Sequence, residues 1–284
     1  MKIAVTGAAG LTGGRVTELL IARGHDVTAV VRSGASSRRV RPGAHIAIAD
    51  CRDAEQLGRA VRSADCLIHV AGIQLSDSVA STCAYGLPPR LIAVSTASAT
   101  LTGHPHAAVY LMHEETLRSK RPDAIIVRPT MIYGSGRDRN VHKVVRFAHR
   151  WRFLPLPGSG TGLIQPIHYR DLADVLVALV GSDPGMTVPA GGPQPLSLAD
   201  AAKAIFMSLG QQTHLVHVPL APAIAVARVW DGMFGSRFAD RLDRSRTDKV
   251  VDITRMTAVT GVSPRPFGDG LASLVAEMRA SGAV

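Results

Sequence analysis

Residues 2–13 read Lys2-Ile-Ala-Val-Thr-Gly-Ala-Ala-Gly-Leu-Thr-Gly13, and this stretch decides the fold class. A short β-branched run ends at Thr6, three glycines follow at a spacing of three, and helical periodicity with Val16, Leu19 and Leu20 begins directly afterwards. Such glycines allow a tight turn, a close backbone approach and tight helix packing, so a pyrophosphate can lie on the unpaired N–H groups of the helix. The stretch therefore predicts a strand, a phosphate loop, a helix and a dinucleotide site.

The pattern continues along the first two-thirds of the chain, where β-branched runs alternate with helical periodicity, as is typical of βαβ units in a parallel sheet. We expect strands at Lys2–Thr6, Asp26–Val31, His45–Ala49, Cys66–Val70, Leu91–Ser95 and Ala124–Arg128, and helices at Thr12–Arg23, Asp53–Arg62 and Ala107–Ser119. Beyond Arg128 proline and glycine become frequent, which indicates a smaller lobe laid over one edge of the sheet.

The end of the second expected strand indicates which dinucleotide is bound. It reads Val30-Val-Arg-Ser33, without the carboxylate that would accept hydrogen bonds from the ribose of NAD. The Arg32 guanidinium can instead hold a 2′-phosphate, which favours NADP(H) over NAD(H), although a solvated surface arginine is the alternative. Asp50 can bind the adenine, and residues 70–72 can pass beneath the coenzyme, or both can be turn residues. The expected coenzyme contacts are Gly7, Ala9, Gly10, Leu11, Thr12, Gly13, Arg32, Asp50, Cys51, Val70, Ala71, Gly72, Pro129 and Met131.

Composition bounds the remaining classes. The chain has 284 residues, 46% hydrophobic and 19% charged, which suits one large domain or a main domain with a lobe and excludes wholesale disorder. It contains no apolar run of about 18 residues and no visible export leader, so we expect a cytoplasmic protein without a membrane span. Cys51, Cys66 and Cys83 are an odd number without a close pair, which argues against a disulfide framework and a zinc site, and we expect no metal.

The net charge of +10 is unevenly distributed, because residues 137–152 hold six basic residues against the single Asp138. Apolar residues recur at helical spacing there, which predicts an amphipathic helix with Asn140 as its N-cap and Trp151 anchored in the core. Its basic face is either merely solvated or binds a phosphorylated substrate, anionic lipid or an acidic protein. Aromatic residues make up only 4% of the chain, which argues against nucleic acid.

Several blocks in a fixed order carry a family resemblance. They are Thr6–Gly13, His69–Gly72, Val127–Gly134, Gln165–Ala173 and Gly261–Leu271. With these blocks the chain resembles an extended, or atypical, short-chain dehydrogenase/reductase of the NAD-dependent epimerase/dehydratase family. The resemblance implies an α/β fold, with a Rossmann-type doubly wound parallel sheet and a small C-terminal α/β substrate lobe. Residues 1–135 would form the coenzyme-binding core, and residues 136–284 would complete the sheet edge at about 163–181 and build the lobe.

The catalytic pair of that family is missing. Its members use a Ser or Thr, a Tyr, and a Lys four residues after the Tyr, since a phenol with a pKa of about 10 needs a neighbouring cation to exchange a proton near neutrality. Here Tyr110 is followed four residues later by Glu114, and the other alignment places His106 at the Tyr position and Tyr110 at the Lys position. Either alignment removes the pair.

Substitutes for the pair are present in the sequence. Ser95, Thr96 and Ser98 follow the fifth expected strand, where the family's hydroxyl donor lies. Tyr110 and His106 are four residues apart and can share a helix face as an acid–base couple. The alternative is a surface turn followed by a helix in which Tyr110 only packs.

Two hypotheses from different classes follow. The first is an NADP(H)-dependent oxidoreductase or epimerase that acts on a small carbonyl or alcohol, which the lobe motifs favour and which we take as the leading one. The second is a structural, assembly or redox-sensing protein that holds NADP(H), as in atypical members that serve respiratory complex I, and the altered Tyr110 region favours it. A nucleotide-sugar epimerase or dehydratase is a further alternative, weakened because Thr130 and Met131 replace the family's Asn. We expect a small-molecule substrate, apolar or phosphorylated, and a monomer or homodimer.

Overall fold

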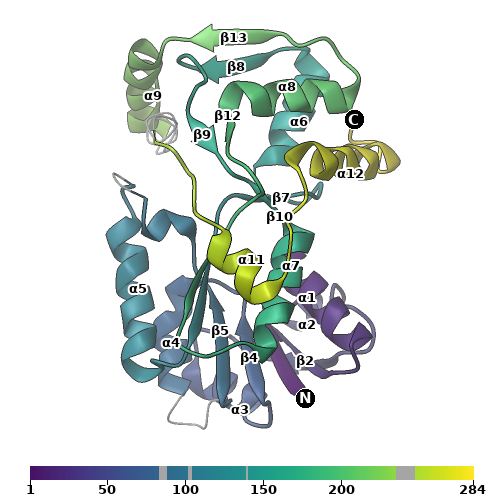
Figure 1. The fold of residues 1–284 in the computed structure, drawn as a ribbon, viewed down its shortest axis with the longest axis vertical. Coiled ribbons are helices and arrows are strands. Elements are labelled where there is room, and N and C mark those ends of the chain that lie inside the picture. The colour runs from purple at the N-terminus through teal and green to yellow at the C-terminus, as the bar shows by residue number, and fades with distance from the viewer. Residues whose placement is uncertain (83–87, 102–103, 139, 235–246) are drawn as a thin grey trace.

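The computed structural model describes residues 1–82, 88–101, 104–138, 140–234 and 247–284 (Figure 1). The strands are β1 (Lys2–Thr6), β2 (Asp26–Val31), β3 (His45–Ile48), β4 (Cys66–His69), β5 (Arg90–Val94), β6 (Ile125–Pro129), β7 (Ile132–Tyr133), β8 (Leu154–Pro157), β9 (Leu163–Ile164), β10 (Ile167–His168), β11 (Thr187–Ala190), β12 (Leu196–Ser197) and β13 (Leu215–Val218). The helices are α1 (Leu11–Ala22), α2 (Gly34–Ser37), α3 (Ala54–Val61), α4 (Ser76–Ser81), α5 (Ala107–Lys120), α6 (Val141–Trp151), α7 (Tyr169–Ala178), α8 (Leu198–Leu209), α9 (Leu220–Phe234), α11 (Thr254–Thr260) and α12 (Phe267–Ala280). Short 3₁₀ turns occupy η1 (Ile73–Leu75), η3 (Ala97–Ala99) and η4 (Leu179–Gly181).

A seven-stranded parallel sheet forms the lower part of the molecule in Figure 1, in the order β11-β6-β5-β4-β1-β2-β3. Helices cover both of its faces, and this is why the strands are apolar on both sides. Ile3 and Val5 pack with α1 and α7 on one face, whereas Ala4 packs with α3 and α4 on the other. The expected doubly wound α/β sheet is therefore confirmed, and its order reverses between β1 and β4, where such sheets bind ligands.

The sheet edge differs from the expectation. The edge strand beside β6 is β11, whose register pairs Thr187 with Ile126 and Ala190 with Pro129. The segment at about 163–181 does not complete the sheet; it contributes β9, β10 and α7. The reason is its helical periodicity, because Leu172, Val175 and Leu176 are buried against the sheet and α1 rather than hydrogen-bonded to a strand.

A smaller lobe lies above the carboxyl ends of the strands in Figure 1 and contains α6, α8, α12 and three two-stranded ladders. Its core gathers Tyr133, Phe206, Leu271 and Leu274, which are fully buried. Within the described ranges, no helix combines the length and the apolar character needed to cross a bilayer.

Helix α6 confirms one expectation in part and corrects another. Asn140 is the N-cap residue, as expected, but its side chain makes no capping bond; Asp138 Oδ1 instead accepts from the backbone N–H groups of Asn140 and His142 at 2.9 and 3.2 Å. Trp151 is not anchored in the core, because 58% of it is exposed. It is the last residue of the helix, beyond the apolar stripe formed by Val141, Val145 and Ala148.

Candidate functional site

The loop between β1 and α1 is shaped by its glycines. Gly7 has a φ of +69°, and its carbonyl accepts from the N–H of Gly10 at 2.8 Å, which closes the turn. A Cβ atom at Gly13 would lie 2.3 Å from the Gly7 carbonyl oxygen. The first turn of α1 therefore packs directly on the loop, and a side chain at position 13 would displace one or the other.

No side chain of α1 offsets the partial positive charge at the N-terminus of this helix. Gly10 is the N-cap and provides no side-chain cap, and no acidic residue lies in the first turn, which begins with Leu11 and Thr12. Its free N–H groups and the positive end of the helix dipole attract an anion. Together with the glycine turn, this forms a cradle for a phosphate.

A buried hydrogen-bond network connects this loop to the one that follows β4. The Thr6 hydroxyl lies 2.9 Å from His69 Nδ1 and accepts from the N–H of Val70 at 3.1 Å. His69 Nε2 lies 3.1 Å from the Gly72 carbonyl, so a tautomer protonated at Nε2 satisfies all three contacts. Burial lowers the pKa of His69 to about 4, and the ring is therefore neutral at pH 7. The sequence analysis did not assign a role to Thr6 or His69.

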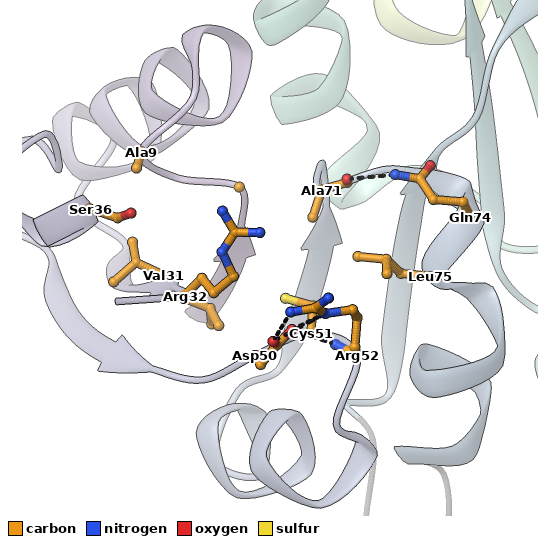
Figure 2. Close-up of a pocket in the computed structure, with 12 residues that line it drawn as sticks. Ala9, Val31, Arg32, Ser36, Asp50, Cys51, Arg52, Ala71, Gln74 and Leu75 are labelled. Atoms are coloured by element: carbon orange, nitrogen blue, oxygen red, sulfur yellow. Dashed lines mark hydrogen bonds and ion pairs between the residues drawn. The ribbon is translucent and has the colours of Figure 1, made fainter. Parts of the chain in front are cut away.

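A cavity of about 310 Å³ opens between the ends of β1, β2 and β4 (Figure 2). Of the expected coenzyme contacts, six line it: Gly7, Ala9, Arg32, Asp50, Cys51 and Ala71. The other lining residues are Val30, Val31, Ser36, Arg52, Gln74 and Leu75. In Figure 2 the guanidinium groups of Arg32 and Arg52 both lie at this opening.

Asp50 and Arg52 form a fixed pair at one side of the cavity. Arg52 donates to both carboxylate oxygens of Asp50, with a shortest distance of 2.7 Å, and these bonds hold the pKa of Asp50 at about 2. By contrast, Arg32 makes no hydrogen bond or ion pair with the described residues, and its side chain is exposed. Burial raises the pKa of the neighbouring Cys51 thiol to about 11, so it is uncharged at pH 7. The cavity therefore offers a net positive charge to an anion.

The remaining expected coenzyme contacts do not line the cavity. Gly10, Leu11, Thr12 and Gly13 form the turn and the start of α1, and Val70 and Gly72 belong to the loop after β4. Pro129 ends β6, and Met131 packs against the core of the lobe. Arg52 was missed, although its position two residues after an Asp at a strand end was visible in the sequence.

Ser95 belongs to a buried charged network at the carboxyl end of β5. Its hydroxyl donates to Glu114 Oε1 at 2.6 Å, and Arg128 Nε donates to the same oxygen at 2.9 Å. The side chains of Glu114 and Arg128 are only 3% and 16% exposed. Arg128 on β6 therefore neutralises the Glu114 carboxylate on α5. That carboxylate in turn accepts the hydrogen bond from the Ser95 hydroxyl. The signal in the sequence was a lone arginine within an apolar strand, Ile125–Pro129, which we did not link to Glu114.

The other candidate catalytic residues are separated. Thr96 accepts from the N–H of Ser98 at 3.2 Å and so caps the η3 turn. Tyr110 packs against the cluster that α3 and α4 form on the sheet. Its backbone N–H donates to the His106 carbonyl at 3.1 Å, but among the described residues no hydrogen bond joins the two side chains. The His106 ring instead lies edge to face with His104 at 6.0 Å. The structure thus does not bring Tyr110 and His106 together as a hydrogen-bonded couple.

The described residues contain no group of three His, Cys, Asp or Glu side chains arranged to hold a metal ion. Cys51 and Cys66 are free thiols, and Cys83 lies outside the described residues.

Parts of this chain are similar in sequence to known proteins. It is 32% identical over 123 residues to "NADH dehydrogenase [ubiquinone] 1 alpha subcomplex subunit 9, mitochondrial" of Arabidopsis thaliana, a match that covers 42% of this chain and 30% of that protein. It is 29% identical over 191 residues to the "Ceramide reductase" of Caulobacter vibrioides, covering 62% of this chain and 60% of that protein. The chain therefore spans less than two thirds of either relative.

Solved structures match over nearly the whole chain. A UDP-glucuronic acid 4-epimerase from Bacillus cereus, in complex with UDP-glucuronic acid and NAD, has a TM-score of 0.77 at 16% identity, and the match covers 99% of this chain and 100% of that chain. A UDP-glucose 4-epimerase from Thermotoga maritima has a TM-score of 0.76 at 17% identity, with 99% of each chain covered. This chain thus shares its fold with these two epimerases. A sequence profile described as "NAD(P)H-binding" matches residues 7–183, the part that carries the glycine turn, the cavity and the β4 loop, and the chain belongs to this NAD(P)H-binding family.

Proposed function

We propose that this protein binds NADP(H) in preference to NAD(H) and holds the coenzyme without the tyrosine–lysine acid–base pair of the dehydrogenases. The observation that carries the proposal is the buried network at Ser95, whose hydroxyl proton is directed to Glu114 and the Arg128 ion pair. The residues that would hold the coenzyme are the glycine turn, the start of α1, and Arg32. When bound, the nicotinamide ring of such a coenzyme can accept or donate a hydride.

The preference for NADP(H) rests on the charges of the cavity. Arg32 follows β2 and is exposed and unpaired among the described residues, whereas Asp50 is held by Arg52 and is not free to accept from ribose hydroxyls. Ser36 on α2 adds a hydroxyl to the same rim. A guanidinium can donate two parallel bonds to a phosphate, and a charge-assisted bond contributes about 1.5–3 kcal/mol, or roughly 10- to 150-fold in affinity.

Calorimetry with NADPH and NADH tests this preference. We expect wild-type protein to bind NADPH roughly 10- to 100-fold more tightly, and Arg32→Gln to abolish most of that difference while leaving NADH affinity unchanged. Arg23→Gln removes an exposed arginine at the far end of α1 and is the matched control. Equal affinity of the wild type for both coenzymes would refute the role of Arg32.

The surroundings of Ser95 support coenzyme binding without catalytic turnover. A hydroxyl that polarises a carbonyl must direct its proton to the substrate, but this one already donates to a carboxylate. Tyr110 lies against the core, and Thr96 caps a turn. A stoichiometric mixture of the protein with NADPH and a panel of aldehydes, quinones and nucleotide sugars should show no oxidation at 340 nm above the buffer rate.

An oxidoreductase is the second candidate, because one relative is named ceramide reductase and because Met131 and Ile132 place apolar surface beside the end of β6. It requires a proton donor outside the Ser95 network, such as substrate or water. Turnover of an apolar carbonyl in the panel, undiminished in Ser95→Ala, would establish this candidate over the first.

A further inference from the structure

Helix α6 carries an exposed surface, here called the α6 face, that is defined by Lys143, Val144, Arg146, Arg150 and Trp151. Lys143, Arg146 and Arg150 are spaced by three and four residues and form one stripe, and Val144 and Trp151 form a second stripe beside it. Val144 is 41% exposed and Trp151 58% exposed. A shallow depression of about 470 Å³ lies along the cationic stripe.

The charges of the α6 face have no partners in the described part of the chain. Lys143, Arg146 and Arg150 form no ion pair there, whereas surface arginines such as Arg59 do. Asp138, the acidic residue that precedes α6 in the sequence, is already engaged, since it is buried against His142. Arg139, the neighbouring basic residue in the sequence, lies outside the described residues.

An indole accompanies the cations. The Arg150 guanidinium lies 5.4 Å from the centre of the Trp151 ring, which keeps a cation and an apolar plane at the same point of the surface. Tryptophan is usually highly buried, and a largely exposed one beside arginines is typical of residues that enter the interface of a bilayer. A soluble polyanion without an apolar surface would use the cations but would leave the indole in water.

The residue that follows α6 supports a role for the charge. Arg152 has a φ of +62° and is the one non-glycine residue with positive φ in the described structure. Glycine or asparagine adopts this conformation at lower cost. A strained and exposed arginine therefore adds a further positive charge directly after Trp151.

We propose that the α6 face docks on the surface of an anionic phospholipid bilayer, with Trp151 in the headgroup region and Lys143, Arg146, Arg150 and Arg152 against lipid phosphates. The occupant is argued from charge complementarity and from the exposed indole. Each cation near such a surface contributes about fivefold in partition, so Lys143, Arg146 and Arg150 together contribute roughly 100-fold. This surface is separate from the coenzyme cavity, and its role does not depend on the function proposed above.

Sedimentation of the full chain with vesicles tests the proposal, with phosphatidylcholine alone or mixed with about 30% phosphatidylglycerol so that the surface is anionic. We expect binding to the mixed vesicles only. The triple variant Lys143→Gln/Arg146→Gln/Arg150→Gln should lose roughly 100-fold in partition. The matched control Arg23→Gln/Arg62→Gln/Arg255→Gln removes the same charge from exposed sites elsewhere and should bind within about threefold of the wild type.

Trp151→Gln separates a bilayer from a soluble polyanion. It should weaken binding to mixed vesicles at least about fivefold and leave binding to polyglutamate unchanged. Absence of wild-type binding to mixed vesicles, equal loss in both triple variants, or no effect of Trp151→Gln on vesicle binding would each overturn the proposal. Coenzyme affinity, measured alongside, shows that the variants are folded.

Discussion

Arg128→Met removes the cation from the most deeply buried arginine–carboxylate pair among the described residues. Glu114, only 3% exposed, would keep the Ser95 hydroxyl as its remaining hydrogen-bond donor among the contacts described. A buried charge that loses its partner destabilises a protein by about 3–5 kcal/mol. For a chain of this size, that free energy corresponds to a fall in melting temperature of roughly 6–15 °C.

The double variant Glu114→Gln/Arg128→Met identifies the cause. Glutamine still accepts from Ser95 but carries no charge, so we expect this variant to be more stable than Arg128→Met alone by about 2 kcal/mol in urea unfolding. Arg59→Met is the control, because the Arg59–Glu55 pair is 66% and 57% exposed and should contribute less than about 1 kcal/mol. The reasoning is refuted if Arg128→Met costs no more than Arg59→Met, or if the double variant is no more stable than Arg128→Met.

Three other outcomes follow from the geometry. Gly13→Ala should weaken NADPH binding at least about 100-fold by calorimetry, because its Cβ would lie 2.3 Å from the Gly7 carbonyl oxygen. The control Gly268→Ala has open space around it and should bind NADPH as the wild type does. Equal affinities of the two variants would contradict this prediction. Because the pKa of His69 is lowered from 6.5 to about 4 in the folded protein, the unfolded chain binds the proton first, and the free energy of unfolding should fall by up to about 3 kcal/mol as the pH drops from 6.5 to 4. Urea unfolding of His69→Gln should show a shallower decline, and an identical decline would exclude His69 as a source. Arg152→Gly should raise the free energy of unfolding by about 1 kcal/mol, seen as a higher melting temperature, because glycine adopts the positive φ without strain. An unchanged melting temperature would show that Arg152 is not strained.

Much of the fold was predictable because it depends on local patterns. The glycine turn, the first two strands, and the helices α1, α3 and α5 lie within one residue of their expected positions. The edge strand was not found, because a four-residue strand such as β11 contains a proline and is specified by its pairing with β6, not by its own composition.

The candidate site was predictable only in part. Residues adjacent to the glycine turn were found because phosphate binding uses backbone groups in a short, recognisable order. The Ser95–Glu114–Arg128 network joins residues 14 to 33 positions apart, and only the parallel packing of β5, β6 and α5 shows that they meet. The exposure of Trp151 was also missed, because helical periodicity does not show how far the buried stripe of a helix extends toward its last turn.

The contacts among Thr6, His69 and Gly72 have a consequence for how quickly a ligand is received. Since these bonds already connect the ends of β1 and β4, two walls of the cavity share one geometry before anything enters. Little conformational entropy remains to be lost on association, so capture should proceed in a single kinetic phase whose rate rises linearly with ligand concentration. A rigid cavity of this kind favours slow dissociation of the bound ligand over rapid exchange.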